Sequence, residues 1–429
     1  MNSLSSRVFR SLTASENGSN VDELPNEPRN FLTHVASLSL TKIADGLIDP
    51  KLVLAWLMTA IGAPTALVGL LVPIREAGAL LPQLFTAAYI HGLQRRKWLW
   101  SLCSIIQGLC ALALAFVSAQ MTGQSGGLAI LAILTILALA RSVCSVSIKD
   151  VMGKTIANSR RGTATGLASS IAAAGVIIFA VLLMFEIVPR SQLVTGGLTL
   201  AGVFWIVSGL IYGSVSEPKS STRKDAATFK SVLKDLSLLK EDAQLRRFIA
   251  VRGLLTATAL APPFMLALAT SAGGGTVLNT LGALVLASAL AGLISGFIWG
   301  KLSDRSSRKV LILAGIVSCV ALIVTAFAAS LGFINHSFAL PGLLFVLMIA
   351  YRGVRIGRNT HLMDMATEDT RAAYTALSNT VIGLLLVLGG AFSLLASIAG
   401  VVSVIVVMAI MCAVAAVAAL GLNEVQNGG

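Results

Sequence analysis

Apolar runs of about 20 residues recur along almost the whole chain, and this feature limits the possible folds most. The runs begin near residue 31 and end near residue 420, and each can cross roughly 30 Å of hydrocarbon as a helix. A helix satisfies its own backbone hydrogen bonds in lipid, whereas barrel strands are about ten residues long and alternate apolar with polar residues. Only 12% of the residues are charged, against about 25% in soluble proteins. The sequence therefore predicts an all-α membrane protein.

The runs predict twelve transmembrane helices and their orientation. We place the helices at 31–57, 65–91, 97–119, 126–148, 163–187, 192–214, 248–270, 277–301, 309–332, 340–359, 372–396 and 398–420. Lysine and arginine gather in the connections that follow even-numbered helices. The positive-inside rule therefore places these connections and both termini in the cytoplasm. We expect a multi-pass protein of a bacterial inner (plasma) membrane, and its net charge of +13 requires no nucleic-acid partner.

The longest hydrophilic connection, residues 215–247, divides the predicted helices into six and six. Within it, Phe229, Leu233 and Leu236 recur at roughly helical spacing among charged residues, which predicts an amphipathic helix at the membrane surface. The predicted organisation is a disordered cytoplasmic tail at 1–30, a six-helix bundle at 31–214, this linker, a second six-helix bundle at 248–420 and a cytoplasmic tail at 421–429.

The two predicted bundles resemble each other in sequence. The segment ALARSV around Arg141 resembles IAYRGV around Arg352 at an offset of 211, and residues 88–97 resemble residues 300–309 at an offset of 212. A third pair, RRGTATGLASS and TRAAYTALSN, has an offset of 210. Two parallel six-helix repeats place a substrate site near the middle of the membrane, where the repeats meet.

The connection between the eighth and ninth predicted helices carries a family motif. Residues 300–309, GKLSDRSSRK, resemble the G-x-L-[AS]-D-R-x-G-R-K signature of the major facilitator superfamily, with Ser307 in place of the usual glycine. The N-terminal copy is degenerate, because Gly92 occupies the aspartate position. The RG of Arg161 and Gly162 also resembles the start of the fifth helix in that family. Together with the helix count, central loop and repeat, the resemblance covers the whole chain.

The resemblance implies two pseudo-symmetric six-helix bundles, a monomer, and a secondary transporter that moves a small molecule by alternating access, coupled to a proton. In the family, the motif aspartate caps a helix start in the opposite half and helps to close the cytoplasmic side. We expect Asp304 to do so near Gly162, since carboxylates favour helix N-termini. The alternative is a basic loop that only determines topology. The candidate gate residues are Gly300, Asp304, Arg305, Arg308, Lys309, Arg161 and Gly162.

Ionisable residues in the first two predicted helices suggest a buried charge cluster. Asp45 and Asp49 lie on one helical face, and Arg75 and Glu76 lie at similar depth in the next helix. Because a charge in the membrane needs a cavity or a partner, we predict pairing of the aspartates with Arg75, with Glu76 beside them. One carboxylate could carry a proton or sodium ion during transport, or the cluster could be a static ion pair.

Arg141 and Arg352 occupy equivalent positions on the fourth and tenth predicted helices, which line the central cavity in the family. Facing each other, they would bind the carboxylate or phosphate of an anionic or zwitterionic small molecule. Alternatively, Arg141 pairs with helix carbonyls or a buried carboxylate. Arg355 and Arg358, and similarly Arg252, are expected to extend toward the cytoplasmic surface. The candidate cavity residues are Asp45, Asp49, Arg75, Glu76, Arg141 and Arg352.

No sequence pattern indicates an enzyme, a cofactor or a metal site. The chain has no Walker A sequence, its four histidines are far apart, and its five cysteines fall within apolar runs as small core residues. A competing hypothesis is a transporter-shaped assembly factor or sensor that moves no solute. The degenerate N-terminal motif supports that hypothesis, which predicts a sealed centre with every charge paired.

Overall fold

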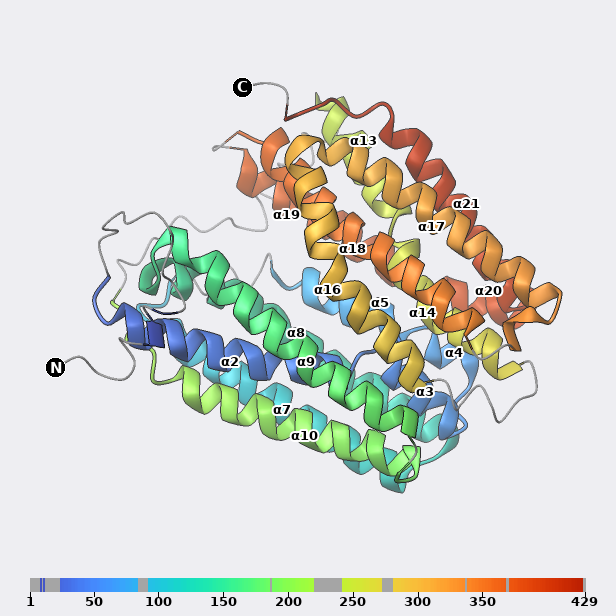
Figure 1. Ribbon diagram of the computed structural model, residues 1–429, viewed down its shortest axis with the longest axis horizontal. Helices are drawn as coiled ribbons and strands as arrows, with labels where there is room; N and C mark the ends of the chain where they lie inside the picture. The colour runs from blue at the N-terminus through green and yellow to red at the C-terminus, as the bar shows by residue number, and fades with distance from the viewer. Residues whose placement is uncertain are drawn as a thin grey trace.

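The structure is a computed structural model that describes residues 8, 9, 11, 24–83, 92–185, 187–219, 241–271, 281–335, 338–367 and 370–426. Within these ranges every regular element is a helix. The amphipathic helix expected in the linker and most of the tail expected at 1–30 lie outside the described residues. The N-terminal half forms the blue-to-green helices and the C-terminal half the yellow-to-red ones (Figure 1).

The helices follow the order of the predicted membrane spans. The N-terminal half contains α2 (Glu27–Leu47), α3 (Val53–Ala60), α4 (Thr65–Val68), α5 (Leu71–Leu80), α7 (Lys97–Gln120), α8 (Gly123–Thr155), α9 (Asn158–Phe185) and α10 (Arg190–Tyr212). The C-terminal half contains α13 (Ala243–Leu254), α14 (Ala257–Ser271), α16 (Leu281–Arg305), α17 (Ser307–Ser330), the 3₁₀ turn η1 (Phe333–Asn335), α18 (Ala339–Met365), α19 (Arg371–Leu388), α20 (Ala391–Ala399) and α21 (Val401–Ala419).

Ten helical stretches of the described residues are long and apolar enough to cross a membrane. The first two predicted spans are not among them: α2 is long enough but carries Glu27, Arg29, Lys42 and Asp45, and α3, α4 and α5 are each shorter than 18 residues. The break after α2 contains Pro50, which has no N–H to donate, and Asp49 accepts a hydrogen bond from the Lys51 amide at 2.8 Å. The structure is thus a multi-span helical membrane protein. The break in its first span lies beside the charged residues Asp49 and Lys51.

Local sequence determines where several helices begin. Ser306 caps α17 by accepting a hydrogen bond from the Lys309 amide at 3.1 Å. Asp242 caps α13 by accepting hydrogen bonds from the amides of Gln244 and Leu245. Such caps satisfy amide groups that have no partner inside the helix.

The two halves are in close contact at one end of the molecule. A Cβ atom added at Gly282 on α16 would lie 2.7 Å from the Ala180 carbonyl oxygen of α9. One added at Gly390, before α20, would lie 2.7 Å from Cδ2 of Leu70, which precedes α5. Glycine allows this close packing, as small residues do at many membrane helix interfaces. We call this the closed end.

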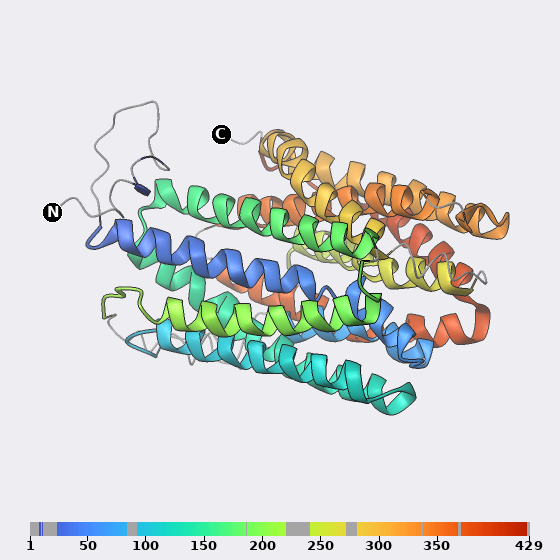
Figure 2. The same cartoon turned by 60° about the horizontal axis from the view of Figure 1, so that its bottom comes forward.

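At the opposite end the same pair of helices separates. In Figures 1 and 2, α9 and α16 approach each other where α9 ends and α16 begins, and they diverge toward the start of α9 and the end of α16. A Cβ added at Gly162 or at Gly300 would meet no described residue of another helix within 4 Å. We call this the open end. It carries the connection between α16 and α17, where the family motif lies.

We expect Gly108→Val to destabilise the fold by about 1–3 kcal/mol, because overpacking strains a tight helix interface. A Cβ at Gly108 on α7 would lie 2.6 Å from Cγ1 of Ile206 and 2.7 Å from the Gly202 carbonyl oxygen of α10. The matched control is Gly196→Val on α10, where a Cβ would have nothing within 4 Å. Melting temperatures of the two purified variants in one detergent test the prediction, and equal values would contradict it.

Candidate functional site

A cavity of about 350 Å³ lies between the two halves. It receives side chains from α2, α5, α8, α10, α16 and α18 and from the break between α2 and α3. All six candidate cavity residues named from the sequence line it. Its polar and aromatic lining residues are Asp45, Asp49, Lys51, Arg75, Glu76, Arg141, Ser145, Trp205, Ser288, Tyr351, Arg352, Arg355 and Arg358.

Asp45 lies between two arginines of its own half. Arg75 donates from Nη2 to Oδ1 of Asp45 at 3.1 Å, and Arg141 donates to the other carboxylate oxygen, Oδ2. The Asp45 side chain is still 24% exposed, because it borders the cavity. The expected pairing with Arg75 is present, and Arg141 has the carboxylate partner that the sequence left as an alternative. These contacts connect α2, α5 and α8.

The other two carboxylates of the cavity make no ion pair among the described residues. Asp49 accepts the hydrogen bond from the Lys51 amide within the break between α2 and α3, so its predicted pairing with Arg75 is absent. Glu76 follows Arg75 on α5 and lines the cavity together with Lys51, Arg355 and Arg358. Glu76 thus lies in a cationic environment that includes residues of both halves.

Lys51 connects the two halves across the cavity. Its side chain is 6% exposed, and its Nζ lies 3.6 Å from the centre of the Tyr351 ring on α18. An ammonium group over an aromatic face is attracted by the electron density of the ring. The break after α2 therefore positions a lysine that contacts the opposite half directly.

Three arginines follow one another on the cavity face of α18. Arg352, Arg355 and Arg358 are separated by three residues each, a spacing that keeps side chains on one side of a helix, and all three line the cavity. The expectation for Arg355 and Arg358 did not include the cavity, at which Arg355 is exposed and Arg358 is half-buried. Helix α18 continues to Met365, beyond the predicted end at 359, so both residues lie within the helix and not at its end.

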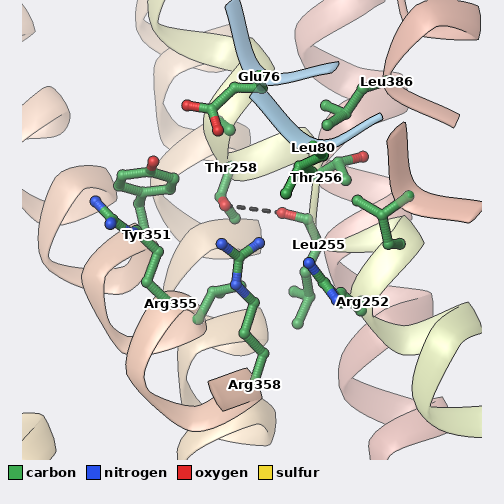
Figure 3. A pocket seen from close by; sticks show the side chains of 13 residues that line it. Glu76, Leu80, Arg252, Leu255, Thr256, Thr258, Tyr351, Arg355, Arg358 and Leu386 are labelled. Carbon is green, nitrogen blue, oxygen red and sulfur yellow. Dashed lines mark hydrogen bonds between the residues drawn. The ribbon is translucent and has the colours of Figure 1, made fainter. Parts of the chain in front are cut away.

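Arg252 is buried, contrary to expectation. Its side chain is 5% exposed and donates to Ser378 Oγ at 2.6 Å and to Asn379 Oδ1 at 2.9 Å. It lines a small pocket of about 20 Å³ beside the cavity, which we call the side pocket. Figure 3 shows the guanidinium groups of Arg252 and Arg358 pointing toward one another, with Arg355 beside Tyr351.

Comparison with known proteins identifies the fold. A family model described as Major Facilitator Superfamily matches residues 249–428. A mutant of the nucleoside transporter NupG is 13% identical, with a TM-score of 0.72 over 92% of this chain and 100% of its own. The protein has the major facilitator fold. The resemblance inferred from the motif is thereby confirmed.

Two further solved structures share this major facilitator fold. A POT family transporter in complex with a thioalcohol-conjugated peptide has a TM-score of 0.68 and 10% identity, covering 92% of this chain and 97% of its own. A D-xylose-proton symporter has a TM-score of 0.68 and 11% identity, covering 93% and 99%. No curated protein matches the chain in sequence.

The signature residues of the major facilitator motif lie at the open end. Asp304 is exposed at the end of α16 and makes no hydrogen bond or ion pair with any described residue. Arg308 instead donates to the Leu422 carbonyl at 3.1 Å, and Ser306 donates to Glu424 at 2.7 Å. The motif thus holds the segment after α21, and the expected contact of Asp304 with the start of α9 is absent from this conformation.

The remaining gate candidates are also at the open end. Arg161 donates to the carbonyls of Ile156 at 2.9 Å and Gly153 at 2.7 Å, so it caps the carboxyl end of α8. Arg305 and Lys309 are exposed, as is Gly162 at the start of α9. The arrangement leaves the start of α9 without a partner from α16.

Sequence reasoning missed several residues that line the cavity. Arg355 and Arg358 could have been found, because they continue the spacing of Arg352 along one helix face. Lys51 follows Asp49-Pro50, a helix-breaking pair that places it in a turn. Trp205 stands in the middle of a predicted span and lines the cavity from α10. For Tyr351, which contacts Lys51, the sequence gives no comparable signal.

Proposed function

We propose that this chain is a secondary active transporter that moves a small molecule across the membrane by alternating access. The cavity between the halves carries the proposal: about 350 Å³, lined by charged side chains of both halves. Its solute would reach it from the open end while the closed end blocks the other side. Cavities of this size hold small-molecule ligands in many proteins.

The proposed cycle exchanges the open and closed ends. The basic connections suggest that the open end faces the cytoplasm, so the described conformation is inward-open in this proposal. Rocking of the halves would separate Gly282 from α9 and Gly390 from Leu70, and would bring α16 toward the start of α9. Asp304 would then cap α9 near Gly162, since a carboxylate is favourable at a helix N-terminus.

The contacts of Asp45 support coupling to a proton as part of this proposal. A proton on this carboxylate would remove the charge that holds Arg75 and Arg141, leaving both guanidinium groups available to an anionic solute. Proton and solute would then enter together. One structural relative is a D-xylose-proton symporter, which supports the choice of a proton over sodium.

Purified protein in proteoliposomes tests the proposed transport. The interior contains a pH-sensitive dye, and the added solutes are succinate, glycerol 3-phosphate, uridine, D-xylose and a dipeptide, each labelled. We expect at least one solute to accumulate when the exterior is acidic, together with acidification of the interior. Empty liposomes are the control. A protein that accumulates none of them across several pH values would favour the non-transporting sensor or assembly factor.

That competing function is less well supported by the contacts described above. It predicted a sealed centre with all charges paired, whereas the cavity is open and Arg352, Arg355 and Arg358 make no ion pair among the described residues. A sensor that binds a solute without moving it would still show binding in the absence of uptake. Measuring binding and uptake on the same preparation therefore separates the two functions.

We expect Asp304→Asn to favour the conformation described here, because the neutral side chain caps α9 less strongly in the opposite conformation. A charge at a helix terminus contributes about 0.3–1 kcal/mol, so the population should shift about two- to fivefold. Labelling of Ser145→Cys in the cavity by a membrane-impermeant thiol reagent, in a background without the native cysteines, reports the opening. Lys301→Gln is the matched control. Unchanged labelling and transport would leave the motif as a topology signal.

A further inference from the structure

The cavity has more cationic side chains than carboxylates to balance them. Six of its lining residues are lysine or arginine and three are aspartate or glutamate. Arg252, in the adjoining side pocket, adds a further cation. Uncompensated charge at membrane depth is costly, so the surplus indicates that something else supplies negative charge.

The carboxylates of the cavity balance the arginines of α18 only in part: Glu76 lines the cavity and the side pocket together with Arg355 and Arg358. Asp45 is held by Arg75 and Arg141. Among the described residues no carboxylate forms an ion pair with Arg352, Arg355 or Arg358, and the Nε atoms of Arg352 and Arg358 are buried without a hydrogen-bond partner. A buried donor without an acceptor is strongly unfavourable. No described residue accepts a hydrogen bond from Arg352 or Arg358, and both side chains line the cavity, so a ligand there could supply acceptors for their terminal nitrogens.

The side pocket is lined by one carboxylate, Glu76, and has two features that favour an anion. The Nε of Arg252 is likewise buried without a partner, and Figure 3 shows Arg252 and Arg358 directed into the same space. The first turn of α14, with Thr258 and Ala259, lines this pocket, and the N-terminus of a helix carries partial positive charge. Cations that face each other in this way repel, and an anion between them removes the repulsion.

We propose that the cavity binds a small organic anion with at least two negative charges, held by Arg355 and Arg358 at the mouth of the side pocket. Both arginines border the cavity and the side pocket. The pocket itself has room for about one water molecule, so the anionic group lies at its mouth. Arg252, on the far side of the pocket, adds positive charge without contacting the ligand. Arg352, one turn away on α18, takes the second anionic group.

The planar fork of arginine suits this ligand. Each guanidinium donates two parallel hydrogen bonds to a carboxylate or phosphate, which lysine cannot reproduce. A dicarboxylate or a phosphate monoester would therefore both satisfy the site, and a neutral solute would leave the arginines unpaired. The proposal rests on the proposed function for taking the cavity as a solute site, but it makes a separate claim about charge.

Binding to the purified full-length chain in detergent tests the charge claim without transport. The probes are labelled succinate and glycerol 3-phosphate, compared with the neutral partners succinamide and glycerol. We expect both dianions to bind and to raise the melting temperature, and the neutral partners to bind at least about tenfold more weakly. A difference between the two dianions identifies which anionic group the site prefers.

Variants of α18 connect that binding to the proposed residues. Arg358→Gln and Arg355→Gln are each expected to weaken dianion binding about tenfold or more, because each removes charge-assisted hydrogen bonds. Arg371→Gln, which removes an exposed arginine outside the cavity, should leave binding unchanged. Arg358→Lys keeps the positive charge but loses the paired hydrogen bonds of the guanidinium group, so its affinity for the dianion should lie between those of the wild type and Arg358→Gln. It remains informative if the glutamine variant does not fold.

The outcomes separate this inference from the proposed function. Dianion binding that depends on Arg358 but occurs without uptake in proteoliposomes would support the inference and contradict transport. Uptake of a neutral solute with no dianion binding would support transport and overturn the inference. Dianion binding unaffected by Arg355→Gln and Arg358→Gln would also overturn it, as would the absence of any binding of either dianion.

Discussion

Asp45→Asn is expected to abolish proton-driven accumulation of solute in proteoliposomes, with a loss of about 100-fold or more, equivalent to roughly 3 kcal/mol. Asp45 bridges Arg75 on α5 and Arg141 on α8. Asparagine is neutral at every pH, so the side chain can neither carry a proton nor hold two guanidinium groups. Initial rates of uptake and of interior acidification measure the effect.

The same substitution should also lower stability, by about 1–3 kcal/mol, because two partly buried arginines lose their counter-ion. Asp364→Asn is the matched control, since that carboxylate is exposed on α18, outside the cavity lining, and accepts a hydrogen bond from Gln426. In the double variant Asp45→Asn/Arg141→Gln, stability should recover in part while proton coupling stays lost. Normal coupling in Asp45→Asn would exclude Asp45 as the proton site and direct the search to Asp49 and Glu76.

Cross-linking the closed end should block transport almost completely. In Leu70→Cys/Gly390→Cys the two thiols should lie close together, since a Cβ added at Gly390 would lie 2.7 Å from Leu70 Cδ2. A short bifunctional thiol reagent would then hold α5 and α20 together and prevent the other conformation. We expect uptake to fall to the level of empty liposomes and to return on reduction if the linker contains a disulfide.

A cysteine pair at the open end is the control for that experiment. Gly162→Cys/Gly300→Cys joins positions that have no described neighbour from another helix within 4 Å, so a short reagent should link them inefficiently in the conformation described here. Solute and an imposed gradient should increase their cross-linking as the halves rock. Full transport with the closed end cross-linked would contradict alternating access at this interface.

The sequence predicted the charge cluster of the first two spans for a clear reason. Residues buried at the same depth on neighbouring helices have few other partners in lipid, and Asp45 with Arg75 met that condition. The partner of Arg141 was left open, because depth alone does not reveal which face of α8 meets α2. Only the packing of the helices brings Arg141 to the second oxygen of Asp45.

The arginines of α18 show the opposite outcome. The predicted span ended at 359, which placed Arg355 and Arg358 near the surface, where long cationic side chains usually reach water. The helix continues to Met365 and its face turns toward the cavity. Lys51 was not predicted to line the cavity, since residues 31–57 were predicted as one helix. The break around Pro50 turns the Lys51 side chain toward the cavity.

The sequence by itself determined the class of fold. Lipid offers no hydrogen bonds to the backbone, so apolar runs of this length can only become membrane helices, and the internal repeat with the motif at residues 300–309 was enough to indicate the major facilitator fold. The tertiary structure alone decided which charges are paired, which face the cavity and which end is open. Those properties depend on helix breaks and on contacts between residues such as Lys51 and Tyr351, 300 positions apart, and no local pattern specifies them.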